Sequence, residues 1–237
     1  MTCYYSTGKS KYMNEGERKN MAIVVDGIIG AGKSTVAHFL SKELGIRLYE
    51  ELEDSNKNSL AQRMLDRFYA DQTRWSAIIQ VMFLNDRFRD IKAIEANEEP
   101  AIIDRSIYGD EIFARTIHHR GQMETDEFVI YRDLLHNMLE HVKPPEVLVY
   151  IDVNIDTAME RISNRNRSTE ADLIPRDYME DLRRHYEEWY DEYDLSPKVK
   201  IDLNDSCANE NGELSDEVKA QIMKAIKPYI AMNMSFA

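Results

Sequence analysis

The feature that most constrains the fold of this chain is a glycine-rich segment near its beginning, Gly27-Ile28-Ile29-Gly30-Ala31-Gly32-Lys33-Ser34-Thr35. It fits the pattern G-x-x-x-x-G-K-[ST], in which glycines let the backbone curl so that successive N–H groups point at phosphate oxygens. An apolar run over residues 21–26 predicts a buried strand before the segment, and residues 35–44 predict a helix after it. A strand, a glycine loop and a helix N-terminus are the context that this phosphate-binding motif needs.

The loop residues have predicted roles in binding a nucleoside triphosphate. Lys33 can reach the β- and γ-phosphates, and the hydroxyl of Ser34 can bind Mg²⁺. The rest of the predicted cradle is Gly27, Gly30, Ala31, Gly32 and Thr35. A chance glycine-lysine loop is the alternative, which the flanking strand and helix disfavour. The motif leaves the acceptor of the phosphoryl group unnamed.

Composition narrows the class of partner. The 237 residues include 43% hydrophobic ones, enough for the core of a single domain over residues 21–237. The net charge of −13 argues against non-specific binding to nucleic acid or to an anionic membrane. An anionic substrate would therefore need a local cluster of basic residues.

The cysteines and the N-terminal residues indicate in which cellular compartment the protein is expected. Cys3 and Cys207 are too far apart in sequence to indicate a zinc site or a disulfide framework. No apolar run approaches the roughly 18 residues of a membrane span, and no signal-peptide core precedes the first strand, so we expect a cytoplasmic protein. Residues 1–20 are polar and predict a disordered leader, with a role in partner binding or a true start at Met21 as alternatives.

Hydrophobic patterning predicts a parallel α/β fold. Apolar runs of strand length alternate with segments of helical periodicity, which predicts a five-stranded parallel sheet covered by helices on both faces. Ligands of such sheets bind beyond the carboxyl ends of the strands, where charged clusters follow four of the predicted strands. The predicted strands are 21–26, 46–49, 100–104, 147–152 and 199–203, and the predicted helices are 35–44, 60–97 with a break near 71–73, 110–120, 125–142, 155–164, 175–193 and 215–230.

One of these clusters, Asp104-Arg105, ends an apolar strand. In a phosphate-loop enzyme an acid at such a strand end typically holds the Mg²⁺ shell, and an adjacent arginine can bind phosphate as a fork. A strand-end ion pair with a surface partner is the alternative. The pair thus predicts a metal and phosphate contact beside the loop.

Four motifs resemble the deoxynucleoside kinase family, which includes deoxycytidine, deoxyguanosine and deoxyadenosine kinases. Residues 104–114, DRSIYGDEIFA, are similar to its segment D/E-R-S-x-Y-x-D-x-x-F. Arg74-Trp75-Ser76 with Gln80 and Arg87 resemble its substrate-binding helix, and residues 161–170 resemble its lid, R-x-x-x-R-x-R-x-x-E. Ile174-Pro175, Tyr178 and residues 186–190 extend the likeness, which spans about residues 21–205 with the phosphate loop.

The resemblance implies a phosphate-loop kinase with an arginine-rich lid at about residues 161–175. It implies transfer of the ATP γ-phosphoryl group to the 5′-hydroxyl of a deoxynucleoside, with Mg²⁺, by a homodimer formed through the helices at 60–97 and 110–142. In this reading Arg105 bridges the hydroxyl and the moving phosphoryl group, and Asp104 holds Mg²⁺. The lid residues Arg161, Arg165 and Arg167 would bind phosphate, or alternatively pair with Glu160 or Glu170 on a helix face.

The general base implied by the resemblance is Glu51. The family usually has Glu-Pro here, whereas this chain has Glu51-Leu52, so Glu50 is a rival and a solvated acidic turn is the alternative. Asp26, before the loop, stands where many members have glutamate. Asn56 stands where some members place an aromatic residue against the base, which would widen the specificity or shift it to purines.

Substrate recognition falls on one predicted helix. Gln80 and Arg87 are seven residues apart on one face, so the amide can pair with a base edge and Arg87, with Asp110 as its buried partner, can donate to the ring. Phe83 could stack on the base, although ordinary core packing is its alternative. The family places the 3′-hydroxyl on Tyr69 and Glu170, and helix packing is the alternative for Tyr69 and Gln80.

We therefore expect deoxyadenosine as the preferred substrate, with deoxyguanosine or deoxycytidine close behind. A nucleoside monophosphate kinase shares the loop and the lid, but it needs further arginines where this chain has Glu51 and Gln80. A regulatory ATPase module would not need the set Tyr69, Gln80, Arg87 and Asp110. The preferred base, the natural donor and the feedback inhibitor are beyond what the sequence predicts.

Overall fold

The computed structural model describes residues 22–51, 59–164, 174–204 and 214–230. The predicted leader 1–20, Asn56, and three predicted site residues, Arg165, Arg167 and Glu170, lie outside these ranges. In the described part of the chain, no helix combines the length and the apolar character needed to cross a membrane.

The centre of the fold is the predicted five-stranded sheet, and all its strand pairs are parallel. The strand order is β2-β3-β1-β4-β5, so β1 and the strands beside it lie in the middle of the sheet. The predicted strands are confirmed to within one or two residues. They are β1 (Ala22–Gly27), β2 (Arg47–Tyr49), β3 (Ala101–Asp104), β4 (Val147–Asp152) and β5 (Lys198–Asp202).

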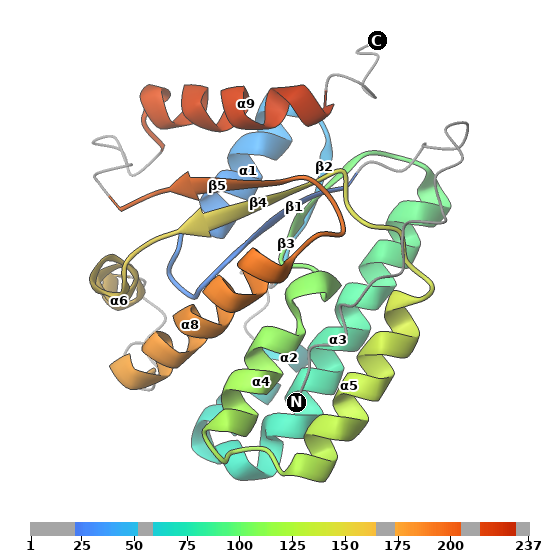
Figure 1. Ribbon diagram of the computed structural model, residues 1–237, viewed down its shortest axis with the longest axis vertical. Coiled ribbons are helices and arrows are strands. Elements are labelled where there is room, and N and C mark those ends of the chain that lie inside the picture. The colour runs from blue at the N-terminus through green and yellow to red at the C-terminus, as the bar shows by residue number, and fades with distance from the viewer. Residues whose placement is uncertain (1–21, 52–58, 165–173, 205–213, 231–237) are drawn as a thin grey trace.

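Helices cover both faces of the sheet. Figure 1 shows α1 (Lys33–Leu44) and α9 (Asp216–Ile230) on one face, and α8 (Arg176–Glu192) with the bundle of α3, α4 and α5 on the other. The remaining elements are α2 (Leu60–Ala70), α3 (Gln72–Asn97), η1 (Ile107–Gly109), α4 (Glu111–His119), α5 (Thr125–Leu139) and α6 (Ile155–Asn164). The short turn η1 was not predicted, and α5 ends three residues before the predicted Val142.

The predicted break in the long helical region is confirmed at Asp71. Its backbone leaves the helical region at φ −153° and ψ 86°, and its carboxylate accepts a hydrogen bond from the backbone N–H of Arg74 at 3.0 Å. A short carboxylate that satisfies an unpaired N–H is a strong helix start. One aspartate thereby ends α2 and begins α3, the helix that carries the predicted substrate residues.

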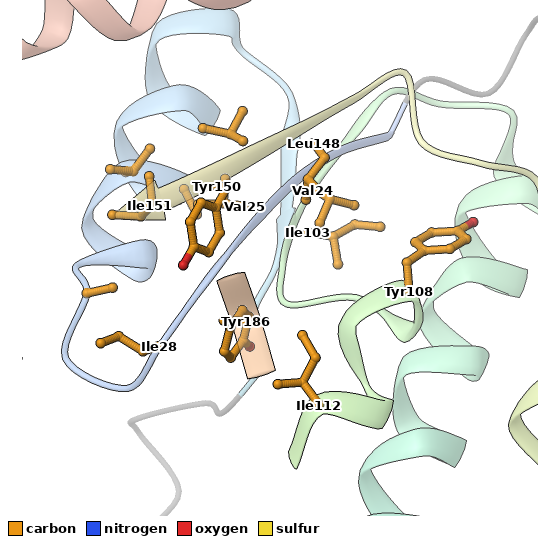
Figure 2. Packing of buried hydrophobic residues seen from close by; sticks show 14 of the residues in the cluster. Val24, Val25, Ile28, Ile103, Tyr108, Ile112, Leu148, Tyr150, Ile151 and Tyr186 are labelled. Atoms are coloured by element: carbon orange, nitrogen blue, oxygen red, sulfur yellow. The ribbon is translucent and has the colours of Figure 1, made fainter. Parts of the chain in front are cut away.

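The core forms where the central strands meet the helices. Val24, Val25, Ile103, Leu148 and Ile151 are at most 3% exposed, which explains why these strands are almost continuously apolar. Figure 2 shows these side chains packed around the central strands, with Ile28, Tyr108, Ile112, Tyr150 and Tyr186 beside them. Each such buried side chain stabilises the fold by about 1.5–3 kcal/mol relative to exposure.

Strand register aligns the residues that follow β1 and β3. Val25 pairs with Asp104, and the backbone N–H of Arg105 donates to the carbonyl of Val25 at 3.0 Å. The indole N–H of Trp189 on α8 donates to the carbonyl of Tyr108 at 3.0 Å and holds the turn after β3. The phosphate loop and the Asp104-Arg105 pair therefore lie at one edge of the sheet, as the sequence predicts.

Candidate active site

The phosphate loop has the tight backbone that its glycines predict. A Cβ on Gly27 would lie 2.6 Å from the carbonyl oxygen of Ile151, and one on Gly30 would lie 2.5 Å from that of Ala158. Both residues also have positive φ, at 151° and 76°. Any side chain would therefore push the loop away from β4 and α6.

Lys33 belongs to the phosphate-loop motif and is the first residue of α1. Its Nζ donates to the carbonyl of Ile28 at 2.8 Å, and the residue is only 7% exposed. Burial, and then the nearby charge of Arg105, lower the pKa of Lys33 to about 7, against the opposing effect of Asp104 and Glu51. A triphosphate in the loop would add negative charge beside this amine and favour its charged form.

The predicted metal residues are in contact. Ser34 Oγ donates to Asp104 Oδ2 at 2.6 Å, and burial raises the pKa of Asp104, with Lys33 acting against it. Among the described residues, no hydrogen-bond partner reaches the buried Oδ1 of Asp104, and no group of three or more His, Cys, Asp or Glu could hold a metal. The carboxylate of Asp104, with its unpaired Oδ1, and the hydroxyl of Ser34 fit a Mg²⁺ ion whose other ligands are phosphate and water.

The two candidates for the general base, Glu50 and Glu51, line the same pocket, but only Glu51 contacts its arginines. Its Oε1 pairs with Arg87 Nη2, and its Oε2 lies 2.8 Å from Arg105 Nε. Glu50 instead pairs with the exposed His38 at 2.9 Å. Glu51 is thus the only one of the two that contacts both arginines, whereas its role as the base stays a prediction.

The two arginines keep Glu51 ionised. Burial by itself would raise the pKa of Glu51, but the charges of Arg105 and Arg87, together with Lys33, outweigh it and leave the pKa below its usual value. The Glu51 side chain keeps 24% of its surface exposed. A carboxylate in this state can accept a proton at neutral pH.

Arg105 is constrained from several directions. Its backbone has φ 65°, a conformation that is costly for a residue with a side chain. Its guanidinium lies 4.3 Å from the ring centre of Phe113 and donates to the hydroxyl of Tyr186 at 3.0 Å. Burial disfavours its charge, but Glu51, Tyr186 and Asp26 raise the pKa of Arg105. The structure therefore places a permanent positive charge beside the loop.

The predicted pair of Arg87 and Asp110 is present. Arg87 Nη1 donates to Asp110 Oδ1, and the side chains are 11% and 1% exposed. Asp110 Oδ2 accepts from the hydroxyl of Tyr131 on α5 at 2.6 Å. Arg87 also lies 5.3 Å from the ring centre of Phe83. The pair joins α3 to the N-cap of α4, and Tyr131 on α5 holds it in place.

The other predicted substrate residues lie on α2 and α3. Gln80 is 6% exposed, and Phe83 is partly buried against the core. Tyr69 is also partly buried, with its ring centre 5.5 Å from that of Phe68. These positions place Gln80, Phe83 and Arg87 in succession along α3, while their contacts with a substrate stay predictions.

Arg161 lies against the phosphate loop but contacts backbone. Its Nη1 donates to the carbonyl of Ala31 at 3.0 Å, and its Nη2 donates to the carbonyl of Leu203 at 2.6 Å. The first arginine of the predicted lid therefore ties the loop to the end of β5. Its predicted phosphate contact is untested, and Arg165, Arg167 and Glu170 lie outside the described residues.

A pocket opens to solvent between β2, α3 and the end of β3. The space of about 270 Å³, part of which is open solvent, is lined by residues that include Glu51, Arg87, Asp104 and Arg105. Asp86 and Asp90 on α3 also line it and were not predicted. Four charged groups, three at the ends of β2 and β3 and one on α3, therefore converge on one cavity, as a substrate site requires.

Sequence reasoning also missed Tyr131 and Tyr186, whose hydroxyls contact predicted site residues. Tyr186 lies in the segment 186–190 that resembles the family, but the resemblance implies no role for it. The available signal was weak, since a buried tyrosine needs a partner for its hydroxyl but the sequence does not say which.

Comparison with known proteins agrees with this geometry. The deoxynucleoside kinase family matches residues 23–230. A deoxyguanosine kinase from Lactobacillus johnsonii is 38% identical over 213 residues, which cover 86% of this chain and 92% of that protein. A deoxyadenosine kinase from Lactobacillus acidophilus is 37% identical over 202 residues, with 81% and 90% covered. A deoxyadenosine/deoxycytidine kinase from Bacillus subtilis is 33% identical, with 79% and 84% covered.

A solved structure agrees as well. Deoxyadenosine kinase from M. mycoides, with the products dCMP and a flexible dCDP bound, superposes with a TM-score of 0.72 at 26% identity and covers 88% of this chain and 100% of that one. The predicted fold and enzyme class are confirmed, including use of a nucleotide as phosphate donor. This chain belongs to the deoxynucleoside kinase family of phosphotransferases.

Proposed function

We propose that this enzyme transfers the γ-phosphoryl group of ATP to the 5′-hydroxyl of a deoxynucleoside in nucleotide salvage, with deoxyadenosine favoured and deoxyguanosine or deoxycytidine also accepted. The observation that carries the proposal is the position of Glu51 between Arg87 and Arg105. One carboxylate thereby reaches both the arginine of the predicted base site and the arginine beside the phosphate loop.

Each residue of the candidate site has its own role in phosphoryl transfer. Glu51 accepts the proton of the 5′-hydroxyl, and Arg105 stabilises the charge that develops on the moving group. Lys33 and the backbone N–H groups of the loop hold the donor phosphates. Ser34 and Asp104 would hold Mg²⁺, which supplies charge neutralisation when bound. The chemistry needs positioning and charge more than covalent steps.

Base recognition is assigned to Gln80, Arg87 and Asp110. Arg87 is a donor and the Asp110 carboxylate an acceptor, so the pair complements a base that presents a ring nitrogen beside an amino group. Deoxyadenosine and deoxycytidine present this arrangement. The names of the similar proteins, which include deoxyguanosine, deoxyadenosine and deoxyadenosine/deoxycytidine kinases, support the same range.

A monophosphate acceptor fits less well. Arg87 and Arg105, the arginines that face the pocket, are already paired with Glu51 and Asp110. An additional phosphate would have to lie beside Glu51 and compete with these carboxylates. This pairing and the family match both disfavour a nucleoside monophosphate kinase.

The test measures ATP-dependent phosphorylation of the four natural deoxynucleosides and of their monophosphates. We expect activity on deoxyadenosine first, and a loss of about 10²–10⁴-fold in kcat for Glu51→Gln, because the amide cannot accept the proton. Glu50→Gln is the matched control, since Glu50 pairs with His38 at the surface. Activity on monophosphates alone would overturn the acceptor, and a normal kcat in Glu51→Gln would overturn the base.

We also propose a homodimer in the cytoplasm. Large apolar side chains on α3 and α5 are exposed, with Ile78 at 43%, Val129 at 59% and Ile130 at 68%. These exposed side chains support an interface on α3 and α5, the helices through which the family resemblance implies a dimer. Light scattering should give twice the chain mass, and Ile130→Glu should give the monomer mass. Fractionation of the source cells would test the location.

A further inference from the structure

Tyr186 on α8 connects Asp26, at the end of β1, with Arg105, the residue after β3. Its hydroxyl donates to Asp26 Oδ1 at 2.8 Å and accepts from Arg105 Nη1 at 3.0 Å. Asp26 Oδ1 also accepts from the backbone N–H of Gly27, the first residue of the phosphate loop, at 2.8 Å. A single hydroxyl therefore joins the end of β1, the loop and the arginine after β3.

The three side chains are isolated from water. Asp26 and Tyr186 are each 1% exposed, and Arg105 is 5% exposed. Figure 2 shows Tyr186 beneath the central strands, between Tyr150 and Ile112. Burial raises the pKa of Tyr186 well above its usual value, so the hydroxyl keeps its proton. In such surroundings a hydrogen bond to a charged group is strong and fixes orientation.

The direction of the two hydrogen bonds follows from the chemistry of the partners. A carboxylate can only accept and a guanidinium can only donate, so the tyrosine proton must point to Asp26 and its lone pair to Arg105. The hydroxyl thus extends the negative charge of Asp26 toward Arg105. Phenylalanine would keep the ring packing and remove this link.

Arg105 needs such support because its backbone is strained. A residue held at φ 65° persists only where surrounding contacts over-determine it. Phe113 stacks on one side of the guanidinium, and Glu51 lies at its Nε. Glu51 must also contact the substrate during the proposed reaction, so it is a poor permanent anchor. Tyr186 is the anchor that the reaction leaves untouched.

We propose that Tyr186 is a positioning residue, which with Asp26 aims the guanidinium of Arg105 at the transferring phosphoryl group. The proposal rests on the proposed function for the identity of that group. It assigns no proton transfer to Tyr186. It predicts that loss of the hydroxyl slows the chemical step and leaves binding of the deoxynucleoside intact.

The first experiment compares Tyr186→Phe with the wild-type enzyme. We expect kcat to fall about tenfold to hundredfold, while KM for the deoxynucleoside changes less than about threefold, because the lost contact acts in the transition state. Tyr150→Phe is the matched control, since Tyr150 is equally buried and its ring stacks near Tyr186 at 6.1 Å. A normal kcat in Tyr186→Phe, or an equal fall in Tyr150→Phe, would overturn the proposal.

A double-mutant cycle with Arg105→Lys separates positioning from general destabilisation. If Tyr186 acts through Arg105, Tyr186→Phe should have little further effect on kcat in the Arg105→Lys background. A purely structural role predicts the same fold-loss in both backgrounds. If Tyr186→Phe does not fold, Asp26→Asn tests the other end of the link with nearly the same shape, and an unchanged kcat there would contradict the proposal.

A crystal structure of Tyr186→Phe gives a readout that does not depend on substrate identity. We expect the Arg105 guanidinium to leave its wild-type position. An unmoved guanidinium would overturn the positioning role even if activity falls. Conversely, if the guanidinium is displaced in the variant but the wild-type enzyme has no activity on any deoxynucleoside, the proposed function is rejected and the positioning role stands.

Discussion

The two sides of the active site are built in different ways. The donor side is one continuous segment, residues 27–35, whose backbone forms the phosphate cradle between β1 and α1. The acceptor side is assembled from separate elements, with Glu51 after β2, Arg87 on α3 and Asp110 before α4. The donor side therefore depends on local backbone geometry, whereas the acceptor side depends on long-range ion pairs.

Substitutions on the donor side should therefore reduce activity alone, whereas substitutions on the acceptor side should reduce both activity and stability. On the donor side, Lys33 donates only to a backbone carbonyl, and the buried Asp104 near it keeps its hydrogen bond from Ser34 when the amine is removed. On the acceptor side, each charge is the partner of another, so removal of one exposes the rest to an apolar environment. The three predictions below test this contrast, from the largest expected effect to the smallest.

Replacement of Lys33 by methionine should abolish activity and spare the fold. We expect kcat/KM to fall about a thousandfold, because the donor phosphates lose their principal cation. Stability should stay the same or rise, since burial already disfavours the charge of this amine and lowers its pKa to about 7. Steady-state kinetics and thermal unfolding measure the two effects. Lys42→Met, at the exposed end of the same helix, is the control. A large loss of stability in Lys33→Met would contradict the proposed difference between the two sides.

Replacement of Arg87 by leucine should damage both activity and fold. We expect KM for the deoxynucleoside to rise about a hundredfold, the cost of a lost hydrogen bond to a charged group. KM for ATP should change little, because Arg87 lies on the acceptor side alone. Removal of one partner of a buried ion pair leaves Asp110 uncompensated and costs about 3–5 kcal/mol of unfolding free energy. Kinetics with each substrate varied, together with denaturant unfolding, provide the test. A rise confined to KM for ATP would contradict the assignment.

The smallest effect concerns His185, the neighbour of Tyr186 on α8. It is 4% exposed, and its Nδ1 lies 2.8 Å from the hydroxyl of Thr116 on α4. Burial, followed by the charge of Arg184, lowers the pKa of His185 to about 4, with Arg115 and His119 acting in the same direction and Glu188 opposing. This histidine therefore belongs to the helix packing that supports the acceptor side.

The sign of its pH dependence follows from the lowered pKa. Between pH 4 and 6.5 the unfolded chain binds a proton at this position that the folded protein does not, so the contribution to stability is full above pH 6.5 and is lost as the pH falls. The expected loss by pH 4 is about 3 kcal/mol, because the pKa differs by about 2.5 between the two states. Unfolding measured from pH 4 to 8 should show a shallower slope for His185→Gln. Equal slopes for the two proteins would show that His185 titrates normally.

Much of the fold was predictable because the relevant signals are local. Apolar runs marked all five strands, and the break at Asp71 separated two helices, since a capping carboxylate acts on its own neighbours. The turn η1 was missed because three residues carry no periodicity. The end of α5 was placed too late, at Val142, because apolar spacing continues past the point where the helix stops.

The candidate site was predictable to a different degree on its two sides. The residues of the donor side stand next to one another, and the resemblance of the acceptor side pointed to Arg87 with Asp110. The contacts of Tyr131 and Tyr186 with the site were not predictable, because each joins residues more than twenty positions apart. The choice of Glu51 over Glu50 as the residue that faces the arginines also required the structure.

By itself the sequence determined the phosphate cradle, the parallel sheet and the edge at which charged residues collect, because each of these depends on neighbouring residues or on strand direction. Only the tertiary structure decided how the charges pair: Glu51 between two arginines, Arg161 on backbone carbonyls, and Tyr186 between Asp26 and Arg105. The physical reason is that a buried charge takes whichever partner packing brings within reach, and packing joins residues that the sequence keeps far apart.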